Sequence, residues 1–407
     1  MSQQISGTKT APKDERSVTP ISDVELERRW SAARAHMREA EIDALVVGGA
    51  NGWAAGYFRW FTGEGVDSGN PRTVLFPVEG LMTLVEHGPL NGEMKLDGSD
   101  PANRGIGRRL TTPSHLFSVC YTGGQDAELI AREIRRAGCR TVGLVGTVGM
   151  YHGFCGPLKE ALSGVSVRDS TDAIDRIKAV KSAEEIGLIR RAAAMQDETI
   201  AAIRKIIRPG MRDFEISAQA EYLGHLYGSD QGIFLGSSAA AGRAAVFRAR
   251  SQQGRPLRAG DTFTLLIENN GPGGFYTEIA RAFVLGKASQ EQVEAVGNVI
   301  EARGNILKRL KPGTPCRDIW EAHNAFMRAR GLPEEKRLNC HNQGYDLVER
   351  PLMRFDETMT VAENMNIACH PGYVTERNFA VLCDNFLIGP DGVTERLHRT
   401  PEELIEL

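Results

Sequence analysis

Along the first part of the chain, some segments have apolar residues at the spacing of a helix, and others are short apolar runs typical of strands. Apolar positions at helical spacing, with charges between them, predict a helix over residues 23–42. The apolar run at 43–49 ends in glycines and predicts a strand, and residues 72–88 predict two paired strands around a turn. A charged helix and a further strand follow within residues 127–146. Because helices and strands alternate, we expect a small α/β domain over residues 21–173.

The second part of the chain opens with a helix start signal. Ser182 is followed three residues later by Glu185, which is the pattern of a capping box, and a helix is predicted from residue 183 to residue 207. Four further elements are predicted: a helix that ends near residue 230, strands at 261–268 and 280–286, and a helix at 290–310.

Two Pro-Gly pairs divide this second part. Pro209 and Pro312 each follow a predicted helix and precede a short loop and a new helix, and they lie 103 residues apart. This repeat favours one domain built from two related halves, with a site between them. Two unrelated helix ends are the alternative.

The composition narrows the class of protein. With 407 residues, 41% hydrophobic and 25% charged, the chain is expected to be globular with two or three domains, not disordered or fibrous. A net charge of -3 argues against binding to nucleic acid or to a membrane surface. Seven cysteines without a CxxC pair predict free thiols and a cytoplasmic location. Residues 1–20 lack an apolar core and are expected to form a disordered polar tail.

Several segments of the second part resemble the pita-bread superfamily, which contains Xaa-Pro aminopeptidase, prolidase, creatinase and methionine aminopeptidase. The resemblance lies in the order and spacing of five segments: IDRIKAVKSAEEIGLIRRAA (174–193), GDTFTLLIENNGPGGFYTEIARAF (260–283), CHNQGYD (340–346), ENMNIACHPGYV (363–374) and AVLCDNFLIGPDG (380–392). It implies an α+β protein with a C-terminal pita-bread catalytic domain of duplicated α/β units at residues 174–407. A smaller α/β creatinase-type N-terminal domain, at residues 21–173, would precede it.

The chain departs from the superfamily at the metal-binding positions. The peptidases of the superfamily hold two metal ions with Asp, Asp, His, Glu and Glu. Carried over in order, these five positions fall on Glu268, Glu278, His341, His370 and Cys383. For the first of them, Ile267 or Asn269 is an alternative to Glu268. Only the histidine is unchanged and both late carboxylates are replaced, so a dinuclear manganese or cobalt site is not expected.

Other residues of these segments are candidates for substrate binding. Where the superfamily usually has a proton-shuttling histidine, this chain has Arg248 and Arg250. Arginine stays protonated and cannot act as a base, but it can bind a substrate carboxylate with two hydrogen bonds. A surface salt bridge is the alternative role. Asn269 and Asp346 are further candidates for contact with the substrate.

Two chemistries fit these residues. Without metal, Glu268 or Glu278 would act as base or nucleophile while His341 and His370 move protons. The reaction would then be hydrolysis of a C–N bond in a small amide, amidine or guanidine carboxylic acid, as in creatinase or in an ectoine-hydrolase-like member. Alternatively, Glu278, His341, His370 and Cys383 would bind one transition-metal ion, because imidazole and thiolate suit zinc, iron or copper better than manganese. The expected cofactor is therefore none or one ion.

The resemblance is also compatible with other functions. The superfamily also contains Xaa-Pro peptidases, a lyase branch that uses iron, and non-catalytic peptide- or histone-binding modules. A small-molecule substrate and a homodimer are expected, as in the superfamily. The aromatic stretch Trp53, Tyr57, Phe58, Trp60 and Phe61 would either pack in the core of the N-terminal domain or line a pocket of the partner subunit.

Overall fold

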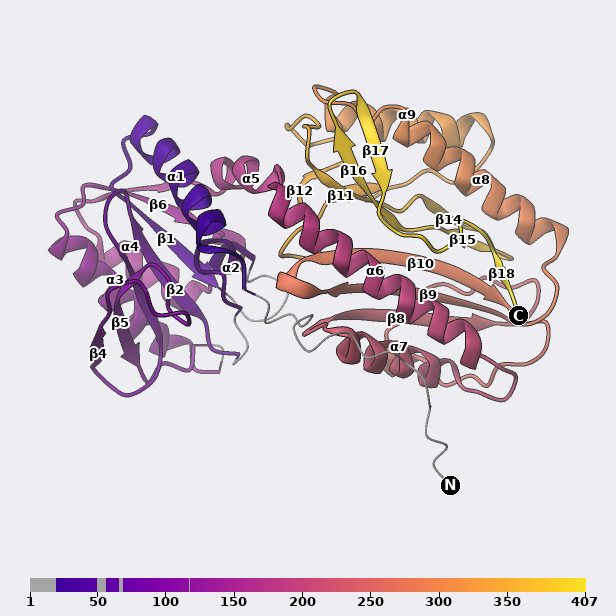
Figure 1. Cartoon of the computed structure of the whole chain (residues 1–407), viewed down its shortest axis with the longest axis horizontal. Helices are drawn as coiled ribbons and strands as arrows, with labels where there is room; N and C mark the ends of the chain where they lie inside the picture. Colours follow the sequence, from indigo (N-terminus) through magenta and orange to yellow (C-terminus); the bar gives the residue numbers. More distant parts are fainter. Residues whose placement is uncertain (1–19, 50–55, 66–68, 117) are drawn as a thin grey trace. The chain divides into compact units, whose positions relative to one another are not determined.

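The structure of the chain is a computed structural model that describes residues 20–49, 56–65, 69–116 and 118–407. These residues form two compact units, Pro20–Lys178 and Ala179–Leu407, which we call the N-terminal and C-terminal units (Figure 1). The expected domain boundary lay at residue 173, and the observed one lies at the end of helix α5 (Thr171–Ala179). The expected polar tail lies almost wholly outside the described residues.

The N-terminal unit is an α/β structure around one seven-stranded sheet with the order β4-β5-β3-β2-β1-β6-β7. Strand β1 pairs antiparallel with β2 and parallel with β6. The elements that precede α5 are α1 (Asp23–Glu39), β1 (Ala44–Gly49), α2 (Gly56–Thr62), β2 (Arg72–Pro77), β3 (Met82–His87), β4 (Gly92–Lys95), β5 (Ile106–Thr112), α3 (Gly123–Arg136), β6 (Thr141–Val145), α4 (His152–Ala161) and β7 (Ser166–Asp169).

The aromatic stretch of the N-terminal unit lies on α2. Phe58, Trp60 and Phe61 are buried, and the ring of Phe61 makes edge contacts with Trp60 and Phe76. Tyr57 is half-buried, and its hydroxyl donates a hydrogen bond of 2.6 Å to Asp175 Oδ1. Core packing within the unit therefore accounts for the three buried rings. Trp53 lies outside the described residues.

The C-terminal unit has two main sheets, β18-β10-β9-β8 and β12-β11-β13-β16-β17, with helices on the outside (Figure 1). Its helices are α6 (Ala183–Ile206), α7 (Asp213–Tyr227), α8 (Gln290–Leu307) and α9 (Cys316–Ala329). Its strands are β8 (Gly232–Ala239), β9 (Thr262–Asn270), β10 (Tyr276–Val284), β11 (Cys340–Asn342), β12 (Glu349–Leu352), β13 (Asn366–Cys369), β14 (Gly372–Val374), β15 (Phe379–Val381), β16 (Asp384–Gly389), β17 (Gly392–Arg396) and β18 (Ile405–Glu406).

Helix ends follow the local sequence closely. The predicted capping box of α6 is present, because Ser182 accepts a hydrogen bond from the Glu185 backbone and Glu185 accepts one from the Ser182 backbone. The helices predicted at 23–42, 183–207 and 290–310 are confirmed, with observed ends within about three residues of the predicted ones. No helix in the described part of the chain has the length and apolar character needed to cross a membrane.

The two Pro-Gly segments have matching backbone structures. Gly210 and Gly313 both adopt the left-handed conformation, with φ of 91° and 87°, which glycine reaches without steric cost. The Gly210 amide donates to the Leu257 carbonyl, and the Gly313 amide donates to the Val361 carbonyl, both at 2.8 Å. Each segment thus ends one helix, pairs with a distant chain segment and starts the next helix. This equivalence supports the prediction of two related halves.

The sheet that contains β9 has one face packed against helices and one face free for a site. Phe234, Ile267 and Ile279 belong to the core formed with α6 and α7. Their sequence neighbours Leu235 and Glu278 point the other way and line a cavity. Because side chains alternate along a strand, this arrangement fixes which residues of β8, β9 and β10 reach the cavity.

Candidate active site

A cavity of about 810 Å³ lies within the C-terminal unit. Most of its wall is apolar and is formed by side chains from β8 to β15, among them Ile233, Leu235, Phe247, Leu266, Phe379 and Val381. Five groups able to carry or bind a charge lie together on one part of this wall: Glu268, Glu278, His341, His370 and Cys383. They are the five residues that the resemblance places at the metal-binding positions, and the structure brings all of them to one cavity.

The two glutamates face each other across neighbouring strands. Glu268 of β9 and Glu278 of β10 are direct partners in the antiparallel register. Directly opposite residues on one face of a sheet have Cβ atoms about 5 Å apart, so the two carboxyl groups interact. Both side chains are buried, with 6% and 5% of the residue exposed. The cavity wall therefore contains a close pair of carboxyl groups shielded from water.

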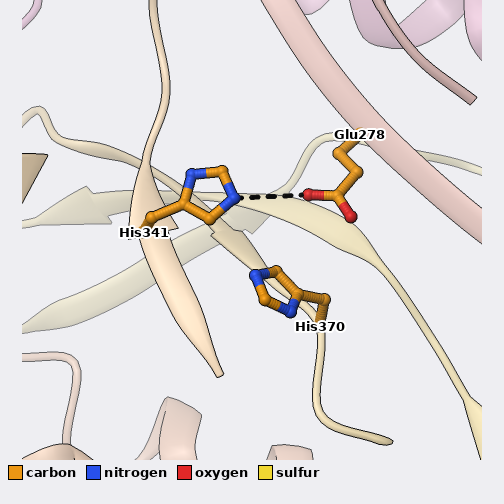
Figure 2. Close-up of side chains that lie close together, drawn as sticks. All are labelled: Glu278, His341 and His370. Atoms are coloured by element: carbon orange, nitrogen blue, oxygen red, sulfur yellow. Dashed lines mark ion pairs between the residues drawn. The ribbon is translucent and has the colours of Figure 1, made fainter. Parts of the chain in front are cut away.

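Two histidines complete this group. His341 lies on β11 and His370 directly follows β13, and their ring centroids are 5.2 Å apart. Nε2 of His341 lies 3.5 Å from Oε2 of Glu278. The carboxylate of Glu278 and the two imidazole rings point toward one another (Figure 2). One donor atom from each of these three residues lies within 4.8 Å of the other two, which is close enough to surround one metal ion.

The hydrogen bond of His341 defines which ring nitrogen is free. Nδ1 of His341 lies 2.9 Å from the Asn342 carbonyl oxygen, which can only accept a hydrogen bond. Nδ1 therefore carries a hydrogen, and Nε2 is the nitrogen that faces Glu278. Histidines that bind metal commonly donate their other ring N–H to a carbonyl in this way.

The environment drives the two glutamates toward opposite protonation states. Burial, and then the charge of Glu278, raise the pKa of Glu268 well above its usual value, against the hydrogen bond from Gln343. Burial would also raise the pKa of Glu278, but His370, His341 and Cys383 outweigh it and lower that pKa to about 2. Glu278 is therefore the more acidic member of the pair.

The same burial favours the uncharged forms of His370 and Cys383. Burial lowers the pKa of His370, with an opposing effect from Glu278. Burial, and then the neighbouring Glu278, raise the pKa of the Cys383 thiol. A thiol in this state is a weak nucleophile. Cys383 therefore fits a role as a hydrogen-bond partner of Glu278 better than a role as an attacking group.

An amide network holds the glutamates, and the sequence did not reveal it. Gln343 Nε2 donates to Glu268 Oε1 at 2.9 Å, and Gln343 Oε1 accepts from Asn385 Nδ2 at 2.9 Å. Asn385 Oδ1 in turn accepts from the Glu278 backbone amide at 2.7 Å. The orientation of Gln343 is thus fixed by its contacts with Asn385 and Glu268. Gln343 lies two positions after His341, a spacing that could have indicated a shared strand face.

Asp384 lies beside Cys383 but has a different environment. It is fully buried, and its carboxylate accepts hydrogen bonds from Arg281 at 2.7 Å and Arg303 at 2.5 Å. Its ion pairs therefore point away from the cavity, as alternation along the chain requires. Asp384 stabilises the strands beneath the site and does not contact the cavity.

The remaining predicted site residues lie elsewhere. Arg248 and Arg250 are exposed, and Arg250 forms an ion pair with Glu221 of α7, the alternative role considered from the sequence. Asn269 is fully buried on the helix-facing side of β9, where its Oδ1 accepts a hydrogen bond from Gln196 of α6 at 2.8 Å. Asp346 is buried, and the described residues that line the cavity include none of these four.

One further histidine lies behind the site. His323 of α9 is buried, and neither ring nitrogen has a hydrogen-bond partner among the described residues. Burial, together with the charge of His370, lowers the pKa of His323 to about 4, so it is neutral near pH 7. Its sequence context gave no sign of this proximity to His370.

Three comparisons place the chain among known proteins. Residues 187–390 match the model of metallopeptidase family M24. The Xaa-Pro dipeptidase of Pyrococcus horikoshii is 26% identical over 261 residues, which cover 62% of this chain and 72% of that protein. The X-Pro aminopeptidase of Thermotoga maritima MSB8 superposes with a TM-score of 0.76 at 17% identity, covering 93% of this chain and 99% of that one.

The same fold also occurs in a protein that is not named as a peptidase. The N-terminal domain of the FACT complex subunit SPT16 from chickpea superposes with a TM-score of 0.68 at 14% identity, covering 94% of this chain and 99% of that one. The predicted pita-bread fold with its N-terminal domain is confirmed by these likenesses. At such low identity, the likeness to these solved structures establishes the fold alone.

Proposed function

The chain belongs to metallopeptidase family M24, and on that premise we propose that it hydrolyses a C–N bond in a small nitrogenous carboxylic acid at a site for one metal ion. The prediction of a hydrolase that acts on C–N bonds is confirmed at the level of the family. The observation that carries the proposal is the convergence of Glu278, His341 and His370, with Glu268 beside them, on the wall of one largely apolar cavity.

The donor set fits one metal ion and does not fit two. Glu278, His341 and His370 supply one carboxylate and two imidazoles, a set that zinc uses in catalytic sites. Two hard ions would need additional bridging carboxylates. By the resemblance, the last two metal ligands of the superfamily peptidases are glutamates. This chain has His370 and Cys383 at those two positions. An ion held by these three donors would act as a Lewis acid on a substrate carbonyl.

The residues of the chain account for the remaining requirements of hydrolysis. Splitting an amide delivers a hydroxyl group to the carbonyl carbon and a proton to the leaving nitrogen. The Glu268 carboxyl faces the cavity beside these three donors, so it is the group that would take the proton lost by the attacking water and pass a proton to the leaving nitrogen. Gln343 and Asn385 hold Glu268 and Glu278 in fixed positions before the substrate binds. The apolar wall keeps water away from the rest of the substrate.

A metal-free hydrolase is the second candidate. It is favoured by the direct register of Glu268 and Glu278 next to His341, because paired carboxyl groups and a histidine can transfer protons without an ion. The two candidates use the same cavity and differ in the metal content of the purified protein.

The proposed function is tested by assaying amine or ammonia release from a substrate panel. We expect turnover of small amides, amidines or guanidines that carry a carboxylate, and weak or no cleavage of Xaa-Pro dipeptides. The reason is that a site with one ion activates a peptide carbonyl less than a site with two ions does. Rapid cleavage of Xaa-Pro dipeptides, with no turnover of the other compounds, would contradict the proposal.

We also propose that the chain forms a homodimer, as the resemblance implies. The three buried rings of α2 pack within their own unit, so they give this proposal no direct support. Light scattering at micromolar concentration should report about twice the chain mass of 44.5 kDa, and a value equal to the chain mass would contradict a dimer.

A further inference from the structure

The cavity has a polar rim that the proposed reaction does not use. The loop between α9 and β11 contributes six consecutive residues, 333–338, to the cavity lining. Asn324 of α9 anchors this loop, because its side chain accepts from the Glu335 backbone amide at 2.8 Å and donates to the Glu335 carbonyl at 3.0 Å. Asn324 itself is buried. The rim is therefore held against the cavity by two hydrogen bonds.

The charges on this rim are unequal. Glu334 forms an ion pair with Arg328, and Glu335 lies 4.0 Å from Nε of Arg337. The charge of Glu335 also reaches His370, whose pKa it raises against the effect of burial. Lys336 is exposed, and no acidic partner for it is found among the residues that the structure describes. The rim therefore presents one uncompensated positive charge, with Arg337 beside it.

The cavity also has an apolar wall, which adjoins the reacting groups at Cys383. Ile233, Leu235, Phe247 and Phe379 pack around the buried cluster of Leu266, Ala280, Val381 and Cys383. The rings of Phe247 and Phe379 meet edge to face at 4.9 Å between centroids. The cavity volume of about 810 Å³ lies in the upper part of the range for drug-sized ligands, roughly 300–1,000 Å³. A small guanidino acid would leave most of this apolar wall uncovered.

We propose that the substrates are N-acyl amino acids, whose acyl chain packs against the apolar wall and whose carboxylate is bound by Lys336. This inference rests on the proposed function, since it names the substrate class of the same cavity. An N-acyl amino acid has an apolar group on one side of its C–N bond and a carboxylate on the other. The lining of this one cavity contains all three features that such a molecule needs: an apolar wall, the Glu268 and Glu278 pair, and the lysine Lys336.

Binding measurements test this inference independently of turnover. Titration calorimetry would compare N-octanoylglycine with N-octanoylglycinamide, which lacks only the carboxylate charge. We expect the acid to bind wild-type protein about fivefold more tightly, the upper end for an exposed ion pair. Lengthening the acyl chain from acetyl to octanoyl should tighten binding by up to about fourfold per methylene. Phe247→Ala should reduce this gain.

Variants of the rim separate charge recognition from general damage. Lys336→Gln should weaken binding of the acid to the level of the amide and leave binding of the amide unchanged, and Lys336→Arg should restore the difference. Lys308→Gln, at an exposed lysine that does not line the cavity, is the matched control and should change neither.

The outcomes also separate this inference from the proposed function. Equal affinities of wild-type protein for acid and amide, no detectable binding of the acid, or equal weakening of both ligands by Lys336→Gln would overturn the role of Lys336. Tight, charge-dependent binding of N-octanoylglycine without its hydrolysis would support the binding roles of Lys336 and the apolar wall and contradict the proposed hydrolysis.

Discussion

Replacing Glu268 by Gln is expected to lower kcat by at least about 10²-fold, the usual contribution of a general acid or base. The amide has nearly the shape of the carboxyl group and can keep the contact with Gln343, but it has no proton to give to a leaving nitrogen. The neutral amide adds no charge beside Glu278, so the variant should fold normally. Steady-state kinetics over a range of pH would measure the loss.

The comparison variant for Glu268→Gln is Glu321→Gln. Glu321 is an exposed residue of α9 and does not line the cavity, so its kcat should stay within about twofold of wild type. Near-wild-type turnover in Glu268→Gln, with an unchanged pH profile, would show that the proton comes from another group.

His341→Ala should remove both the bound ion and most of the activity. The imidazole supplies one of three donors, and two remaining donors hold a divalent ion poorly. The Lewis-acid contribution is worth several kcal/mol, so kcat should fall by about 10³-fold. Elemental analysis and kinetics on the same preparation would measure the two losses together.

His225 provides the control for the histidine variant. It is an exposed residue of α7 whose Nδ1 lies 2.8 Å from the Ser229 carbonyl, and it does not line the cavity. His225→Ala should keep its ion and its activity. If His341→Ala kept a full equivalent of ion, the assignment of His341 as a ligand would be wrong, whatever the effect on kcat.

The sequence could predict those parts of the molecule that depend on local chemistry. Ser182 and Glu185 start a helix by satisfying each other's backbone groups, and this needs only their spacing. The two Pro-Gly segments stop helices for a similar local reason, since proline cannot continue a helix and glycine adopts positive φ. His341 could be identified because its segment resembles a superfamily motif.

Contacts between distant chain segments could not be predicted from the sequence. The hydrogen bond that Asn269 accepts from Gln196 of α6 joins residues 73 positions apart in the sequence. Gln343 contacts Glu268 only because two sheets meet, and no local pattern encodes that meeting. The place of Lys336 on the rim depends on a loop that Asn324 anchors. The exposed position of Arg250 likewise reflects its pairing with Glu221 on another helix.

The metal content of the wild-type protein tests the central claim most directly. Protein purified without chelators, after growth with zinc, iron, manganese and cobalt available, would be analysed for bound metals per chain. The arrangement of Glu278, His341 and His370 predicts one equivalent, with zinc as the expected ion. Two equivalents of manganese or cobalt per chain, or full activity in protein that carries no metal, would contradict it.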